Sequence, residues 1–291
     1  MELQAFDGKR AAFLRTLRYR KGRALYRIGL MDAAAGEWRR LRNCRNFPPP
    51  SWVKGRRRRR CGYHGDAGGD LLALHLKKVK LFNTATRMFR GRGKIAGKAS
   101  FVPGKAAFWY VSYPRPFWKF VRPSARKARV DPALAYALMR EESGFRPEVV
   151  SHANAYGLMQ MIIPTAQRTA NSVMPGVRIT PAMLTNPKIN IRLGTAHMRE
   201  LLNQFGGSYP MVLAGYNAGA KWVRRWLRRN PSLPFDEWVE AVSIKETRKY
   251  IKRVLQSFCI YRFMYERVRR PGRLIRVRPW WRPGRLLRRR R

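Results

Sequence analysis

The sequence predicts a mainly α-helical protein, and three observations support that prediction. Apolar residues recur at helical spacing along most of the chain, no alternating strand pattern persists, and glycine and proline interrupt the helical stretches. The 291 residues are 45% hydrophobic, which is enough to build a core and excludes a wholly disordered chain. We therefore expect one large or two ordinary domains made of helices, with few strands.

The first part of the chain, residues 1–111, is predicted to be a basic helical segment. Helical spacing of apolar residues appears in 11–17, in 24–41 and again in 71–89. Helix–turn–helix units of this style stack into repeat-like superhelices, although a plain helical bundle fits the pattern equally well. The five arginines at 56–60 stand among prolines and glycines and are predicted to form a loop.

The clearest helix is predicted at residues 131–143. Asp131 is a favourable N-cap, Pro132 suits the first helical position, and Gly144 and Pro147 end the helix. Further helices are expected near 164–173, 190–205, 209–217, 220–229, 235–242 and 246–266. Residues 112–266 should form one compact domain. Residues 267–291 carry 12 basic and no acidic residues among prolines and glycines, and are predicted to be a disordered basic tail.

The net charge is the most unusual property of the sequence. There are 63 lysines and arginines against 16 acidic residues, a formal charge of +47. Such a charge implies a polyanionic partner or uncompensated self-repulsion. Basic runs are commonly solvated faces or flexible arms; attraction to anionic envelope polymers or a membrane surface is a second interpretation. Nucleic-acid binding is a third, but no nucleic-acid-binding motif accompanies the charge.

Several classes of protein are excluded. The three cysteines and four histidines are scattered, so neither a disulfide framework nor a metal site is expected, and no cofactor motif is present. No run approaches the ~18 consecutive apolar residues of a membrane-spanning helix. The N-terminus shows no signal peptide, so either the protein stays inside the cell or this is not the natural start.

Glu142 has an unusual place on the helix predicted at 131–143. At ~100° per residue, its direction falls in the middle of the apolar face, whereas Glu141 lies about 100° away at the edge of that face. The apolar neighbours are Leu134, Ala135, Leu138 and Met139. A carboxyl in such surroundings has a raised pKa, and a rise of ~2 units costs about 2.7 kcal/mol. Proteins tolerate this cost mostly where a protonated acid is useful. The alternative is that Glu142, in the last turn, extends its carboxyl to solvent or pairs with Arg140 or Arg146.

Two further segments carry polar side chains between small residues. Gly157 precedes an apolar turn that contains one amide, Gln160, and it would let the backbone approach a ligand or a neighbouring helix closely. Tyr216 and Asn217 stand side by side between small residues. Helix packing explains each segment alone. Together, a buried acid with Gln, Tyr and Asn side chains has the composition of a sugar-binding site, because amides and phenols hydrogen-bond to hydroxyl and N-acetyl groups.

At this point the chain resembles a known family. Residues 140–145 (Arg-Glu-Glu-Ser-Gly-Phe), 157–160 (Gly-Leu-Met-Gln), 216–219 (Tyr-Asn-Ala-Gly) and 246–250 (Glu-Thr-Arg-Lys-Tyr) are similar to four ordered motifs of soluble lytic murein transglycosylases. The resemblance covers about residues 112–265. It implies a lysozyme-like α-helical catalytic domain of the goose-lysozyme type. It also implies that residues 1–111 are a remnant of the α-superhelical scaffold that precedes this domain in the family.

The resemblance implies an activity and a set of site residues. Glu142 would be the single catalytic acid, cleaving the β-1,4 bond between N-acetylmuramic acid and N-acetylglucosamine in peptidoglycan strands with formation of a 1,6-anhydro-muramoyl product. No cofactor or metal is implied, and the location would be the periplasm or cell envelope. Tyr216 would hydrogen-bond to Glu142. The other implied positions, which support the helix end, bind sugar or complete the cleft, are Ser143, Ser151, Gln160, Ile162, Asn217, Glu246 and Tyr250.

The distribution of acids bears on the mechanism. Most glycosidases use two carboxylates, ~5–9.5 Å apart. Between Ser143 and Pro234 the only acids are Glu148 and Glu200, and Glu200 is expected to face solvent from the middle of a helix. A mechanism with one acid therefore suits the sequence better, while Glu148 leaves a hydrolytic, lysozyme-like muramidase as an alternative function.

Overall fold

The computed structural model describes residues 20, 23–25, 34, 37 and 112–266 of the chain. The chain divides into two compact units, Met1–Pro114 and Arg115–Arg291, and most of the described residues belong to the second. The predictions for 11–17, 56–60, 71–89 and the tail 267–291 lie outside the described residues. Of the segment 24–41, positions 24, 25, 34 and 37 are described, and all four are helical.

The described part of the second unit is mainly α-helical, as predicted. Its helices are α7 (Trp118–Ala128), α8 (Pro132–Glu142), α9 (Ile163–Val173), α10 (Pro181–Thr185), α11 (Pro187–Gln204), α12 (Tyr209–Ala218), α13 (Ala220–Arg229), α14 (Phe235–Ala241) and α15 (Lys245–Tyr265). A short antiparallel pair, β1 (Ala155–Tyr156) and β2 (Met161–Ile162), places Ala155 opposite Ile162. The helices α7 and α10 were not predicted, and α11 begins three residues earlier than expected.

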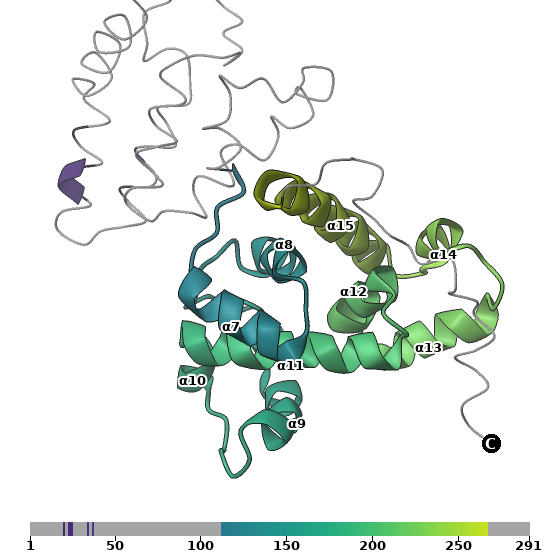
Figure 1. Cartoon of the computed structure of the whole chain (residues 1–291), viewed down its shortest axis with the longest axis horizontal. Helices are drawn as coiled ribbons and strands as arrows, with labels where there is room; N and C mark the ends of the chain where they lie inside the picture. The colour runs from purple at the N-terminus through teal and green to yellow at the C-terminus, as the bar shows by residue number, and fades with distance from the viewer. Residues whose placement is uncertain (1–19, 21–22, 26–33, 35–36, 38–111, 267–291) are drawn as a thin grey trace, which may run out of the picture. The chain divides into compact units, whose positions relative to one another are not determined.

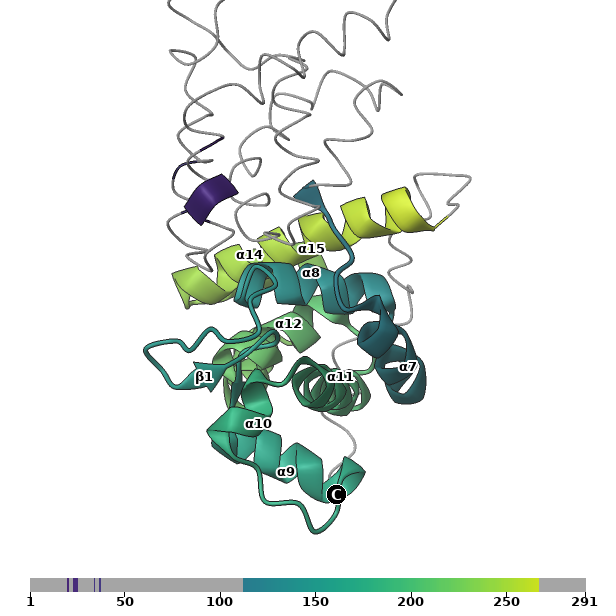
Figure 2. The same cartoon turned by 90° about the vertical axis from the view of Figure 1, so that its left-hand side faces the viewer.

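The helices are arranged around α11. In both views α9 and α10 lie on one side of α11, and α8 and α15 lie on the other (Figure 1, Figure 2). The helix α7 packs against α11, and α15 packs along α8 and α12. Among the described residues, no helix combines the length and apolar character needed to cross a membrane.

The helix α8 lies in the core of this unit. It begins as predicted, because the Asp131 carboxylate accepts a hydrogen bond of 2.8 Å from the Ala133 amide and Pro132 takes the first helical position. All residues from 133 to 140 are buried. The expected single apolar face was therefore too narrow, since a helix that is buried on all sides has no solvent face. The two glutamates follow this fully buried stretch at the C-terminal end of α8.

The end of α8 is tied to the turn that precedes β2. The Ser143 hydroxyl donates to the Leu158 carbonyl of this turn at 2.8 Å, and it also lies 3.1 Å from the Met139 carbonyl. The Asn190 side chain holds the same turn from α11, accepting from the Met159 amide at 2.8 Å. These hydrogen bonds therefore fix the position of the turn relative to both α8 and α11.

Gly157 makes this arrangement sterically feasible. Its φ of +77° lies in the left-handed region, and a Cβ at this position would come within 2.1 Å of the Leu184 carbonyl oxygen and 2.6 Å of the Asn190 amide nitrogen. The close backbone approach predicted for Gly157 is confirmed, with α10 and α11 as the neighbours.

Replacing Gly157 by alanine should therefore destabilise the fold. We expect a loss of at least about 3 kcal/mol of unfolding free energy, from the left-handed backbone and from overpacking together. Gly176 is a matched control, because its φ is +78° but nothing lies within 4 Å of its added Cβ. Gly176→Ala should cost only about 1–2 kcal/mol. Equal losses for the two variants in chemical denaturation would contradict the steric argument.

Candidate active site

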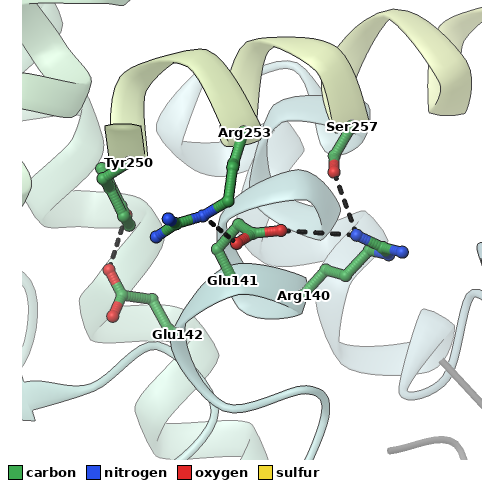
Figure 3. A network of polar contacts seen from close by, with 6 residues as sticks. All are labelled: Arg140, Glu141, Glu142, Tyr250, Arg253 and Ser257. Atoms are coloured by element: carbon green, nitrogen blue, oxygen red, sulfur yellow. Dashed lines mark hydrogen bonds and ion pairs between the residues drawn. The ribbon is translucent and has the colours of Figure 1, made fainter. Parts of the chain in front are cut away.

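The candidate site is centred on Glu142, at the last residue of α8. Tyr250, on the first turns of α15, donates its phenolic hydrogen to Glu142 Oε1 at 2.5 Å (Figure 3). The Tyr250 side chain is buried, whereas Glu142 keeps partial exposure to solvent. The hydrogen bond joins residues 108 positions apart in the sequence.

The surroundings of Glu142 raise its pKa to about 7. Desolvation by burial is the main cause, and the hydrogen bond from Tyr250 acts in the opposite direction. Negative charge on Glu141 and Glu246 raises the pKa further, and the positive charge of Arg253 lowers it. The C-terminal end of a helix also disfavours a carboxylate there. About half of the Glu142 carboxyls are therefore protonated near neutral pH.

The alternative in which Glu142 pairs with Arg140 or Arg146 does not occur. Arg140 contacts Glu141, and the Arg146 side chain donates to the Ser143 carbonyl. Within residues 112–266, no ion pair involves Glu142. Desolvation thus acts on Glu142 without a cation in direct contact to offset it.

Glu141 has a different environment from its neighbour. Its side chain is only 3% exposed and contacts two guanidinium groups, that of Arg140 at 3.3 Å and that of Arg253 at 2.8 Å (Figure 3). Arg140 also contacts the Ser257 hydroxyl at 3.3 Å, so the network joins α8 to α15 at two places. Because Arg253 lies one turn after Tyr250, this network holds the phenol of Tyr250 against Glu142. The sequence placed Glu141 at the edge of the apolar face and did not predict this role.

The expected hydrogen bond from Tyr216 to Glu142 is not present, and this expectation is corrected. The Tyr216 hydroxyl donates to the Met159 carbonyl at 2.8 Å and contacts the Met161 sulfur at 3.3 Å. Tyr216 lies near enough to Glu142 for that charge to raise the pKa of the phenol, although burial is the larger cause. The Met159 carbonyl of the turn at 157–160 accepts the hydrogen bond from Tyr216, and Tyr250 donates to Glu142 instead.

The other expected site residues lie on the segments around this centre. Ser151 accepts from the Ala155 amide, and the Gln160 amide nitrogen donates to the Val149 and Gly157 carbonyls at 3.1 and 3.0 Å. Ile162 is 41% exposed on β2. Ser143 is buried, so its hydroxyl is used within the fold.

Asn217 and Glu246 lie where α12 meets α15. The exposed Asn217 accepts a hydrogen bond of 2.6 Å from the Thr247 hydroxyl. Glu246, the neighbour of Thr247, is exposed, and its charge acts on Glu142. The structure thus gathers residues of α8, α12 and α15 around one carboxyl.

The two remaining acids of the sequence argument have different environments. Glu148 is exposed. Glu200 was expected to face solvent. Its side chain is 38% exposed, and its carboxylate also lies 3.0 Å from His197 Nδ1 and accepts from the Thr169 hydroxyl at 3.3 Å. Among the described residues, no group of three His, Cys, Asp or Glu side chains is placed to hold a metal ion.

Comparison with known proteins agrees with this geometry. Residues 120–239 match the family model described as "Transglycosylase SLT domain". A curated relative from Haemophilus influenzae, a soluble lytic murein transglycosylase, is 33% identical over 175 residues, covering 60% of this chain and 28% of its own length. The soluble lytic murein transglycosylase of Escherichia coli is 36% identical over 133 residues, covering 45% of this chain and 20% of its own length. The chain therefore spans less than a third of the length of these relatives.

Solved structures show the same fold. The lytic transglycosylase Slt of Pseudomonas aeruginosa, in an inactive mutant form, matches with a TM-score of 0.64 at 24% identity, over 86% of this chain and 36% of that one. The 70-kDa soluble lytic transglycosylase of Escherichia coli matches with a TM-score of 0.56 at 22% identity, over 91% of this chain and 48% of that one.

The fold and its desolvated carboxyl define a lysozyme-like α-helical domain. Over residues 120–239 this domain is similar to the Transglycosylase SLT domain family, and its relatives carry names of lytic murein transglycosylases. Tyr250 lies beyond the residues that the family model matches, and the structure brings it to the acid.

Replacing Glu142 by glutamine should stabilise the fold at high pH. Below about pH 4.5 the carboxyl is protonated in both the folded and unfolded states, so its ionisation contributes nothing. Between about 4.5 and 7 the unfolded chain releases a proton that the folded chain keeps, so the free energy of unfolding falls as pH rises. Above pH 7 the loss of unfolding free energy that Glu142 causes in the parent chain is constant, at most about 3 kcal/mol.

Chemical denaturation of Glu142→Gln and the parent chain between pH 4 and 9 measures this effect. The unfolding free energies of the two proteins should be similar in acid and should differ increasingly as the pH rises toward 7. Glu148→Gln is the matched control, because Glu148 is exposed. A constant difference across the whole pH range would contradict the raised pKa of Glu142.

Proposed function

We propose that the chain acts as a peptidoglycan lytic transglycosylase. The activity is the cleavage of the β-1,4 bond between N-acetylmuramic acid and N-acetylglucosamine, with a 1,6-anhydro-muramoyl product. The observation that carries the proposal is the largely buried carboxyl of Glu142, which has no cation in contact and accepts a hydrogen bond from Tyr250. This burial raises its pKa to about 7, which lets one carboxyl donate and later accept a proton near neutral pH. The names of the curated relatives support the same activity.

The hydrogen bond from Tyr250 decides which oxygen of Glu142 carries the proton. Because Tyr250 donates to Oε1, that oxygen acts as an acceptor, and the acidic proton belongs on Oε2. Within the described part of the chain, Oε2 has no hydrogen-bond partner. Burial and the charge of Glu142 raise the pKa of Tyr250 well above its ordinary value, so Tyr250 remains a neutral donor.

The proposed reaction uses Glu142 twice. Its Oε2 proton goes to the glycosidic oxygen as the bond from C1 of the muramoyl sugar breaks. The C6 hydroxyl of the same sugar then bonds to C1, and its proton returns to the Glu142 carboxylate. No water is consumed, and the enzyme returns to its starting state. While Glu142 is ionised, the Tyr250 hydrogen bond stabilises its charge.

The environment of the neighbouring acids supports a mechanism with one carboxyl. The Glu141 carboxylate is held between two guanidinium groups, which makes it unsuited to act as a nucleophile or base. The hydrolytic alternative requires a second carboxylate, for which the sequence indicated Glu148. Glu148 is exposed and its charge is not among those that act on Glu142, whereas the charge of the exposed Glu246 is.

Sugar contacts are proposed for the residues around the acid. Ser151, Gln160 and Ile162 would contact the glycan from the β1–β2 side, and Tyr216 and Asn217 from α12. Ser143, whose hydroxyl bonds to backbone carbonyls, would support the end of α8. The bulgecin A complex of the 70-kDa soluble lytic transglycosylase shows that a related protein binds this compound.

Digestion of purified sacculi with analysis of the products by mass spectrometry tests the proposal. The parent chain should release anhydro-muropeptides, and Glu142→Gln should lose about 100- to 10,000-fold of the activity, because that is the contribution of the proton transfer that it removes. Glu246→Gln should keep anhydro products. Reducing-end products that disappear in Glu246→Gln would favour the hydrolytic alternative, and an active Glu142→Gln variant would refute the assignment.

We further propose that exposed cations hold the enzyme on anionic polymers of the cell envelope, where its substrate lies. The helix α13 buries Val223, Trp226 and Leu227 and exposes five cations, which are Lys221, Arg224, Arg225, Arg228 and Arg229. In the described part of the chain, none of these five takes part in an ion pair. The basic tail 267–291 would add to the same attraction.

Removing two of the α13 charges should weaken retention on sacculi. We expect Arg224→Gln with Arg228→Gln to shift elution from sacculi to lower salt, while turnover of short soluble glycan fragments changes less than about twofold. Removing two exposed cations from α7, in Arg122→Gln with Arg126→Gln, controls for net charge. Equal shifts for both pairs would show a general charge effect and contradict a role of α13. Tighter binding to duplex DNA than to sacculi would favour the nucleic-acid interpretation.

A further inference from the structure

A cavity lies between α7, α9 and α11, on residues that the proposed reaction does not use. Its volume is about 680 Å³, within the ~300–1,000 Å³ range of ligand pockets. One face of α7 and one face of α11 form its walls, and Ser172 and Val173 at the end of α9 contribute to the lining. We call this cavity the α7–α11 groove, and both apolar and charged residues lie along it.

Five cations from two helices converge on the α7–α11 groove. They are Lys119 and Lys127 of α7 with Lys188, Arg192 and Arg199 of α11. Among the described residues, no ion pair involves any of these five. The single acid in the lining is Glu200. The groove therefore carries a net positive charge that Glu200 offsets only in part.

The two arginines of the groove are held in place by backbone carbonyls. Arg192 donates to the Val173 carbonyl at the end of α9, and Arg199 donates to the Ala128 carbonyl at the end of α7 at 2.7 Å. A guanidinium has five N–H donors, so each arginine keeps donors for a ligand. Held guanidinium groups lose little conformational entropy on binding a carboxylate, which favours anion binding.

Glu200 indicates that the ligand is not a simple polyanion. One oxygen of its carboxylate is engaged by Thr169 and His197, and the other has no partner in the described part of the chain. Its side chain is 38% exposed within the groove. A polyphosphate would meet repulsion there, whereas a ligand with an amine would gain an ion pair. The lining thus fits several carboxylates together with one amine.

The dimensions of the groove indicate a short extended chain. Lys188 and Glu200 are 12 residues apart on α11, which corresponds to about 18 Å at the helical rise of 1.5 Å per residue. An extended peptide rises about 3.3–3.6 Å per residue, so about five residues would span this length. The apolar part of the lining, with Phe120, Pro123 and Ala196, suits the small side chains of such a peptide.

We propose that the α7–α11 groove binds a short acidic peptide that carries one amine. Its carboxylates would contact the cations between Lys188 and Arg199, and its amine would contact Glu200. The source is the peptide chains that peptidoglycan strands carry, and this part rests on the proposed function. The groove would then hold the enzyme on peptide-bearing regions of the wall while the glycan lies at Glu142.

Isothermal titration calorimetry of the full chain with a synthetic tetrapeptide tests the groove itself. The probe is acetylated alanine–glutamate–lysine–alanine with a free carboxyl terminus, which has two carboxylates and one amine. In 0.15 M salt, the triple variant Lys119→Gln, Lys127→Gln, Lys188→Gln should bind about tenfold more weakly than the parent chain. The triple variant Arg122→Gln, Arg126→Gln, Arg178→Gln, which removes three cations outside the lining, should bind within about twofold of it.

The role of Glu200 has its own measurement. Glu200→Gln should weaken binding of the lysine-containing peptide about threefold and leave binding of the norleucine analogue unchanged. In the parent chain, bound peptide should also protect Lys119, Lys127 and Lys188 from acetylation more than it protects Lys221. Equal affinity for a peptide without carboxylates, tighter binding of tripolyphosphate than of the peptide, or no protection of the groove lysines would overturn the proposal.

The source of the peptide is tested separately from the activity. Sacculi from which an amidase has removed the peptides should retain the parent chain less well than intact sacculi, and the groove triple variant should show no such difference. Glu142→Gln should lose activity and keep peptide binding, so failure of the proposed function would leave the groove result intact. Retention that does not depend on the wall peptides would refute peptidoglycan as the source.

Discussion

The arrangement of the site depends on the burial of α8. Because residues 133–140 are buried on all sides, the helix can place charged groups only at its end. Two consecutive glutamates stand there and meet different partners on α15. Glu141 meets Arg253, and Glu142 meets the phenol of Tyr250. Burial raises the pKa of Glu142 to about 7, which suits the proton transfer that acid catalysis requires.

The choice of partner for each glutamate has a physical reason. A guanidinium in contact with Glu142 would favour the ionised form and remove the proton that cleavage requires. A phenol orients the carboxyl and lowers its pKa less, so desolvation still determines the result. Glu141, which is nearly inaccessible, would be a costly buried charge without its two guanidinium partners. Glu141, which is ion-paired, therefore fixes the position of α8 relative to α15. Glu142, which has no ion pair, can exchange its proton with a substrate.

Local features of the sequence predicted much of the fold and the central acid. Asp131 and Pro132 predicted the start of α8, and Gly157 predicted a close approach of the backbone, which the structure shows. The helix α7 was missed because its exposed face is strongly basic and Pro123 lies inside it. The partners of the two glutamates lie 108 and 112 residues away, so no local pattern predicts them. The sequence also predicted Tyr216, and not Tyr250, as the hydrogen-bond donor to Glu142. Both phenols lie near Glu142, and only the packing of the folded domain determines which one donates to it.

The cations of this domain make several different kinds of contact. Arg140 and Arg253 neutralise a buried acid, whereas Arg192 and Arg199 donate to carbonyls at the ends of α9 and α7. Only the cations that make neither kind of contact, as on α13, remain wholly available to an anionic partner. Within residues 112–266, the number of cations therefore overstates the capacity to bind polyanions. The positions of the cations, and not their number, determine which anions the domain can bind.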